Sequence, residues 1–110
     1  MKQQGSVWVA DLEPTFRAEP GKVRPVLILQ SDVLNRLSHP TTVVLPISSQ
    51  PSTAEVLRIP ITTSFLRTQS YLLVDQIRAI DNKRLLYRIG NVSQRTMVET
   101  LHAIHILLGM

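Results

Sequence analysis

Short apolar stretches with alternating polarity recur along most of the chain. In "SVWVADL", Val7 and Val9 alternate with Trp8 and Ala10, which is the period of two of a half-buried strand. Five later stretches are also predicted to form the sheet: "PVLILQ" (25–30), "TTVVLPISS" (41–49), "AEVLRIPIT" (54–62), "SYLLVDQIRAI" (70–80) and "LYRIGNV" (86–92). Polar turns separate them, and "EPTFRAEPGK" (13–22) is predicted to be a long loop. Many short strands with polar turns predict a small barrel or a strongly twisted sheet.

Helical signals are fewer. Ser31 or Asp32 can cap a short helical turn that runs through Asn35, and "DNKRL" (81–85) is typical of another turn. The segment 93–109, "SQRTMVETLHAIHILLG", has the spacing of an amphipathic helix with Ser93 at its N-cap. The sequence therefore predicts a mainly β fold with a C-terminal helix.

The C-terminal helix carries more apolar side chains than one face can hold. We expect one strip to pack on the sheet; it comprises Met97, Leu101, Ile104 and Leu108. A second strip comprises Ala103, Ile106 and Leu107. A small domain seldom covers both sides of a terminal helix, so the second strip favours self-association, and a deep socket within one subunit is the alternative.

Length and composition limit the class of protein. A chain of 110 residues with 44% hydrophobic content can bury one core, so residues 1–110 are expected to form a single domain. Cysteine is absent, which excludes a disulfide framework and suits a reducing compartment. There is neither a signal-peptide pattern at the N-terminus nor an apolar run long enough for a membrane span. We expect a soluble, cytoplasmic protein without membrane attachment.

Positive charge favours a polyanionic partner. The formal net charge is +4, and most of the cations are arginines, whose planar guanidinium matches pairs of phosphate oxygens. These arginines lie mostly at the predicted strand ends and turns rather than along one helix. The pattern therefore indicates a groove formed by loops on a sheet.

The sequence contains no known motif for binding a metal or a phosphate-containing cofactor. Glu99 and His102 form one Glu-x-x-His pair, but a di-iron bundle needs two copies. No His-Glu-x-x-His, Gly-x-Ser-x-Gly or Gly-rich phosphate loop is present in the sequence. We expect an enzyme that works without a metal or another cofactor.

Polar residues at predicted strand ends form the candidate site. They are Glu19, Arg24, Ser48, Ser49, Asp75 and Gln76. Each has a simpler alternative: Glu19 can balance Lys22, the serines can begin the turn before Pro51, and Asp75 can pair with Arg78. Together, however, neighbouring strand ends of a small barrel can surround one anion with carboxylate, guanidinium and hydroxyl groups.

Five stretches carry a family resemblance. "VWVADLEPT", "AEPGKVRPVLIL" with "SD" and "N" after it, "VLPISSQ", and "LLVDQIRAIDNKRL" ahead of "IGNVSQRTM" resemble the successive signatures of the MazF/PemK toxins of bacterial toxin–antitoxin pairs. The resemblance implies an SH3-like small barrel of the CcdB/PemK type, a homodimer, and a metal-independent endoribonuclease that cuts single-stranded messenger RNA at a short sequence. It also implies a cognate antitoxin whose acidic tail covers the RNA groove.

The resemblance also assigns roles to residues. Arg24 matches the family's loop arginine and Glu19 its loop glutamate, while Ser48 stands where the family usually has threonine. Some members have an arginine two positions before the Asp-Gln pair, where this chain has Leu73. We therefore expect Arg24 to stabilise charge, Ser48 to add a hydrogen bond, and Glu19 to be the first candidate for accepting the 2′-OH proton. Six further residues are expected to bind RNA: Lys22, Asn35, Ser49, Asp75, Gln76 and Arg78.

Two alternatives share the fold. The CcdB toxins act on gyrase through a C-terminal Trp-Gly-Ile, whereas this chain ends in "LLGM". A degenerate family member would bind RNA or antitoxin without cutting. The C-terminal sequence, together with Arg24 and Ser48, favours the nuclease.

Overall fold

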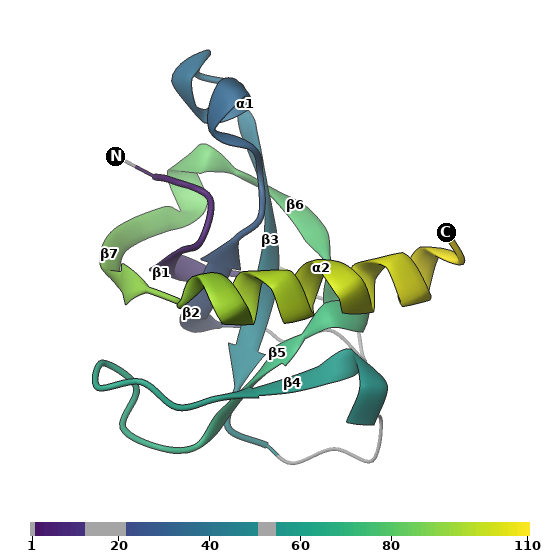
Figure 1. The fold of residues 1–110 in the computed structure, drawn as a ribbon. Helices are drawn as coiled ribbons and strands as arrows, with labels where there is room; N and C mark the ends of the chain where they lie inside the picture. The colour runs from purple at the N-terminus through teal and green to yellow at the C-terminus, as the bar shows by residue number, and fades with distance from the viewer. Residues whose placement is uncertain (1, 13–21, 51–54) are drawn as a thin grey trace.

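The computed structural model describes residues 2–12, 22–50 and 55–110, and these form a curved antiparallel sheet crossed by one long helix (Figure 1). The strands are β1 (Ser6–Asp11), β2 (Val23–Ile28), β3 (Thr41–Ser48), β4 (Arg58–Ile61), β5 (Ser70–Leu73), β6 (Arg78–Asp81) and β7 (Leu85–Asn91). The helices are α1 (Asp32–Arg36), α2 (Gln94–Leu108) and the short 3-10 helices η1 (Glu55–Leu57), η2 (Val74–Gln76) and η3 (Asn82–Arg84). The predicted mainly β fold with a C-terminal helix is confirmed.

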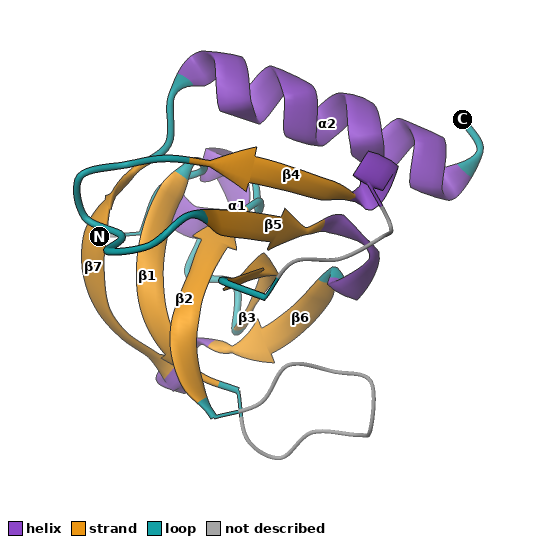
Figure 2. Ribbon diagram, turned by 90° about the horizontal axis from the view of Figure 1, so that it is seen from below, coloured by secondary structure: helices purple, strands orange, loops and turns teal. Residues whose placement is uncertain are grey.

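Strand β3 connects the two parts of the sheet. One of its edges pairs with β2, while its other edge pairs with β6 over its first half and with β5 near its end. The sheet continues from β2 through β1 to β7 and from β5 to β4. Figure 2 shows β7, β1 and β2 as a curved wall, with α2 lying over β4 and β5.

Two predicted strands are interrupted in the structure. The prediction of one strand over 70–80 is wrong, because η2 separates β5 from β6 there. Both strands use the same edge of β3, and the turn at η2 moves the chain from one part of that edge to the other. Val74, which is fully buried, anchors this turn. The predicted strand over 54–62 is also shorter, because η1 precedes β4.

Both faces of the central strands are buried. Alternate residues of β2 belong to two apolar clusters, with Leu27 on the side of α2 and with Val26 and Ile28 on the opposite side. Leu45 and Val44 of β3 divide between the clusters in the same way. Complete burial of such side chains contributes about 1.5–3 kcal/mol each, so β2 and β3 form the most strongly held part of the fold.

Helix α2 begins and ends as the sequence predicts. The side chain of Ser93 accepts a hydrogen bond from the backbone N–H of Thr96, which is the predicted N-cap. Gly109 ends the helix in the left-handed conformation at φ 71°. In the structure, α2 packs against β4, η1 and η2.

The two predicted apolar strips of α2 are not divided as expected. Met97, Ile104 and Leu107 pack on the core around buried Ala103, so the buried face takes residues from both strips. Leu101, Ile106 and Leu108 remain exposed, as does Val98 at 62% of its surface. Exposed apolar surface therefore remains on α2, as expected. The residues differ from the prediction, because Leu107 packs on the core whereas Leu101 and Leu108 are exposed.

Helix α1 is attached to the N-terminal segment by polar contacts. Asp32 accepts hydrogen bonds from the backbone N–H of Gln4 at 2.8 Å and from the side-chain amide of Asn35 at 3.2 Å. These donors hold the pKa of the Asp32 carboxyl below its ordinary value of 3.8, the Gln4 N–H being the larger cause. Ser31 occupies the N-cap without a side-chain cap bond.

Candidate functional site

A cavity of about 320 Å³ lies where β2 begins, β3 ends and the segment between β4 and β5 passes by. Its lining is mostly polar and hydroxyl-rich. The lining residues are Arg24 and Pro25 from β2, Ile47 to Gln50 at the end of β3, and Leu66 to Thr68 with Ser70 from the third segment. Among these residues the only charged ones are Arg24 and Arg67, so the described wall of the cavity is cationic.

Strand pairing places Arg24 and Ser48 at this cavity. The ladder between β2 and β3 pairs Val26 with Pro46, and continuing two residues outward along each strand leads to Arg24 and Ser48. Arg24 is also fixed from its other side, where it pairs with Ala10 of β1. The guanidinium and the hydroxyl thus come from neighbouring, well-anchored strands, which limits the reorganisation needed when an anion binds.

Ser48 has a structural contact as well as a place in the cavity. Its hydroxyl oxygen accepts a hydrogen bond from the backbone N–H of Gln50 at 3.1 Å, so it begins the turn that follows β3, as the simpler interpretation had it. A hydroxyl that accepts one bond retains its own hydrogen for donation. The turn therefore holds the oxygen in place while leaving the O–H able to donate to an anion.

Lys22 lies at the entrance of the 13–21 segment. Its carbonyl accepts a hydrogen bond from the N–H of Leu12 at 2.9 Å, which extends the β1–β2 pairing to the point where that segment begins. The backbone of Lys22 has φ 64°, in the left-handed region that costs a non-glycine residue of order 1–3 kcal/mol. Glu19, the predicted proton acceptor, lies outside the described residues.

Asp75 and Gln76 lie in η2 and do not line the cavity. The carboxylate of Asp75 forms an ion pair with Arg58 of β4, and the two side chains are 29% and 16% exposed. The suggested pairing of Asp75 with Arg78 is therefore wrong. The Arg58–Asp75 pair joins η2 to β4, a structural role that can coexist with a role at the edge of a longer RNA site.

Arg78 and Asn35 are likewise outside the cavity lining. Arg78 begins β6 opposite Val44, and its Nη1 atom is buried without a hydrogen-bond partner among the described residues. Asn35 is buried, and its amide donates to the carbonyl of Gln30 at 3.1 Å and to Asp32. Ser49 is different, because it lines the cavity beside Ser48.

Four polar cavity residues were not predicted from the sequence: Gln50, Arg67, Thr68 and Ser70. Three of them come from the segment between β4 and β5 and the start of β5. The polar stretch "TTSFLRTQ" gave only a turn signal. The pairing of β5 with Ile47 and Ser48 brings this stretch to the end of β3 and so to the cavity.

Sequence comparison decides the family. The pattern described as "PemK-like, MazF-like toxin of type II toxin-antitoxin system" matches residues 3–108. The chain belongs to the PemK/MazF family. A relative from Staphylococcus saprophyticus, named endoribonuclease MazF, is 35% identical over 113 residues, which cover 100% of this chain and 93% of the relative. Endoribonuclease EndoA of Bacillus subtilis is 35% identical over 111 residues, covering 98% and 95% respectively.

Solved PemK/MazF-family structures share the fold. MazF from Deinococcus radiodurans superimposes with a TM-score of 0.85 at 19% identity, covering 99% of this chain and 97% of the other. A mycobacterial endoribonuclease in complex with its cognate antitoxin gives a TM-score of 0.81 at 22% identity, covering 100% and 97%. The predicted CcdB/PemK-like fold class is thereby confirmed for this family member.

The described part of this PemK/MazF chain was compared with the requirements of a metal site and of a membrane-spanning helix. Residues 2–12, 22–50 and 55–110 contain no group of three His, Cys, Asp or Glu side chains that could hold a metal ion. Within the same ranges no helix is long and apolar enough to cross a membrane.

Proposed function

We propose that this protein is an endoribonuclease that cuts single-stranded RNA without a metal and acts as the toxin of a type II toxin–antitoxin pair. The observation that carries the proposal is the cavity lined by both Arg24 and Ser48, which lie on neighbouring strands. Family membership supports the reaction type, since relatives at 35% identity over nearly their whole length are named endoribonucleases.

The chemistry that suits these groups is an internal transfer at phosphorus. The ribose 2′-oxygen attacks its own 3′-phosphate, so an O2′–P bond forms and the P–O5′ bond breaks. One product ends in a 2′,3′-cyclic phosphate and the other in a 5′-OH, with one proton leaving O2′ and one reaching O5′. Negative charge grows on the non-bridging oxygens, and fixed donors stabilise it there.

The donors are the parts of the site that the described residues supply. Arg24 contributes the charge, because a guanidinium stays protonated in proteins and is a poor base. Ser48 contributes a neutral hydrogen bond, and Glu19 is the proposed acceptor of the 2′-OH proton. Lys22, Ser49, Gln76 and Arg78 are proposed to bind the flanking RNA, while Asp75 and Asn35 would act mainly by positioning η2 and α1.

The proposed partners follow from charge and exposed surface. A cognate antitoxin with an acidic tail would complement the cationic cavity and compete with RNA. The exposed apolar side chains of α2 would be covered by a second copy of the chain, giving a homodimer. Since messenger RNA and an antitoxin are the proposed partners, the protein is proposed to act in the cytoplasm.

A gyrase-binding toxin on the same fold is the less favoured function. The relatives that are 35% identical over nearly their whole length are named endoribonucleases, which favours RNA cleavage over binding to gyrase. A member that binds RNA without cutting is separated from the proposed enzyme by the following experiment.

Incubation of the purified protein with a long mixed-sequence RNA should produce discrete fragments, and excess EDTA should leave their yield unchanged. An Arg24→Ala variant purified in parallel should cut about 10²–10³-fold more slowly, because it lacks the charged donor, and this variant also controls for contaminating nucleases. Its melting temperature should match that of the wild type. Loss of cutting in EDTA that magnesium restores, or an equally active Arg24→Ala protein, contradicts the proposal.

Replacement of Ser48 tests whether its oxygen acts in the reaction. Ser48→Ala should slow single-turnover cleavage at saturating enzyme, whereas Ser48→Thr should retain most of the rate because it keeps the hydroxyl. Since Ser48 also accepts a bond from Gln50, thermal melting of both variants is needed as a control. If the alanine variant melts at a lower temperature but cuts as fast as the wild type, Ser48 has only a structural role in the turn. Ser49 then becomes the next candidate for the hydroxyl that acts in the reaction.

The dimer is tested on α2. Ile106→Asp places a charge on a side chain that is 51% exposed in one subunit, so it should spare the fold yet disrupt a dimer that buries this position. Sedimentation at micromolar concentration should give a dimer for the wild type and a monomer for the variant. Gln94→Asp, at the exposed start of the same helix, serves as the matched control. A monomeric wild type rules the dimer out.

A further inference from the structure

Resting on the endoribonuclease function proposed above, we infer that Arg67 is a second phosphate-binding cation of this site. It would hold the RNA phosphate next to the one bound by Arg24. The cavity lining contains both arginines, Arg24 from the start of β2 and Arg67 from the segment between β4 and β5. No carboxylate occurs among the described lining residues.

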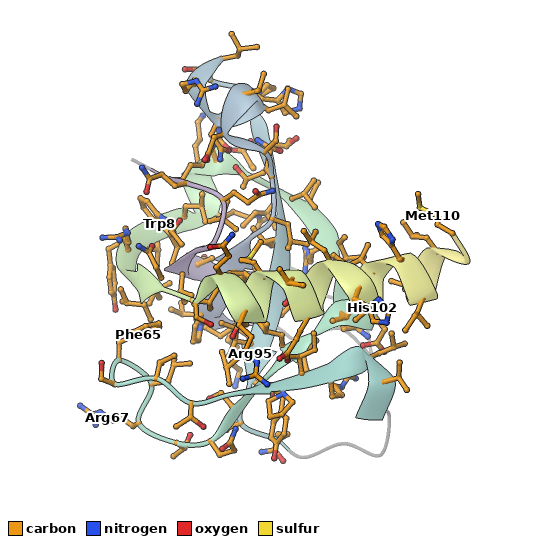
Figure 3. All side chains as sticks on the ribbon, in the orientation of Figure 1. Trp8, Phe65, Arg67, Arg95, His102 and Met110 are labelled. Atoms are coloured by element: carbon orange, nitrogen blue, oxygen red, sulfur yellow. The ribbon has the colours of Figure 1, made fainter. Side chains whose placement is uncertain are left out.

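Arg67 is available for a ligand. It is exposed, and within the described ranges it forms neither a hydrogen bond nor an ion pair. Three other arginines are engaged within the described ranges: Arg58 binds Asp75, Arg95 binds Glu99, and Arg84 donates to the carbonyl of Asp11. In Figure 3 the Arg67 side chain extends outward from its segment, where an incoming backbone can reach it.

The segment that carries Arg67 is held at both ends. The amide of Gln69 donates to the carbonyl of Ile61 at 3.1 Å, and the hydroxyl of Thr62 lies 3.1 Å from the side-chain oxygen of Gln69. The hydroxyl of Ser70 donates to the carbonyl of Thr68 at 3.0 Å. These bonds fix the residues that flank Arg67 and reduce the entropy lost when a phosphate binds.

Phe65 anchors the middle of the same segment to β7. Its ring lies over Gly90 so closely that a Cβ atom on residue 90 would be 2.5 Å from Phe65 Cδ2. Phe65 is also part of the side-chain layer that packs on the α2-side core. The absent side chain at Gly90 is therefore what lets the segment approach β7, and Arg67 follows two residues after this contact.

Thr68 and Ser70 complete the same edge of the cavity. The hydroxyl of Ser70 already donates to the carbonyl of Thr68, so Thr68 is the neutral donor beside Arg67, as Ser48 and Ser49 are beside Arg24. Two cations, each with a hydroxyl group beside it, suit two successive phosphates of a single strand better than one isolated anion. Arg67 would thus contribute to RNA affinity and to the register of the strand, while the chemical step depends on Arg24.

The test measures binding and cleavage separately. A fluorescein-labelled mixed-sequence single-stranded RNA, followed by anisotropy from low to moderate salt, reports affinity and its salt dependence. Arg67→Ala should weaken binding several-fold and lower the slope of log K against log salt by about 0.7, the value for one lost contact on a single strand. Arg67→Lys should keep the slope. Arg95→Ala, which removes a cation on α2 that is 89% exposed, should change neither quantity.

Cleavage distinguishes this role from that of Arg24. With Arg67→Ala, kcat/KM should fall several-fold while the single-turnover rate at saturating enzyme stays close to that of the wild type. Arg67→Ala with unchanged affinity and salt slope overturns the inference and leaves the nuclease proposal intact. A wild type that shows the Arg67-dependent slope yet cuts no RNA supports the inference and contradicts the nuclease. A wild type that does not bind RNA overturns both.

A Gly90→Ala variant tests the anchoring of the segment. The added methyl group must displace Phe65, so RNA affinity should fall in the same direction as for Arg67→Ala. Combining Gly90→Ala with Arg67→Ala should add little further loss of affinity, because both changes remove the same contact. Fully additive losses, with both proteins folded by thermal melting, show that the Phe65 contact does not position Arg67 and overturn this part of the inference.

Discussion

Strand β3 is hydrogen-bonded along both of its edges, and the geometry of the site depends on this double pairing. On one side β2 fixes where Arg24 meets the end of β3. On the other side β5 pairs with Ile47 and Ser48 and so brings the Arg67 segment to the same place. Because β2 and β3 are buried on both faces, the ends of these strands form a stiff frame for otherwise exposed polar groups.

That stiffness matters because the proposed reaction depends on donors that are in place before charge develops. Arg24 stands between two neighbouring strands, and Ser48 is held by the N–H of Gln50. The carboxylate of Asp75 pairs with Arg58 and does not line the cavity. The charged residues among the described lining are therefore both arginines, and this wall is cationic. Under the proposed function, such a cationic site would attract an RNA backbone and also an acidic segment of the antitoxin that competes with RNA.

Local patterns predicted most of the elements, because strands with alternating polarity and the Ser93 cap are encoded by neighbouring residues. The turn at η2 was missed because residues 70–80 were assigned as one continuous part of the sheet, and only the pairing with β3 shows where the chain bends. The division of α2 into buried and exposed faces was partly wrong because both strips are apolar. Arg24, Ser48 and Ser49 were predicted for the site, whereas Arg67 required knowledge of which distant strands pair.

In the reaction proposed for the Arg24–Ser48 cavity, the ribose 2′-OH of the RNA is the nucleophile. An RNA oligonucleotide that spans a mapped cut site should be synthesised with a single 2′-deoxynucleotide on the 5′ side of that bond, and its products compared with those of the unmodified RNA by mass spectrometry. The proposed reaction predicts that the deoxy substrate binds but is not cut, while the unmodified RNA yields a 2′,3′-cyclic phosphate and a 5′-OH. Cutting of the deoxy substrate at the same bond, or products with a 5′-phosphate, would contradict it.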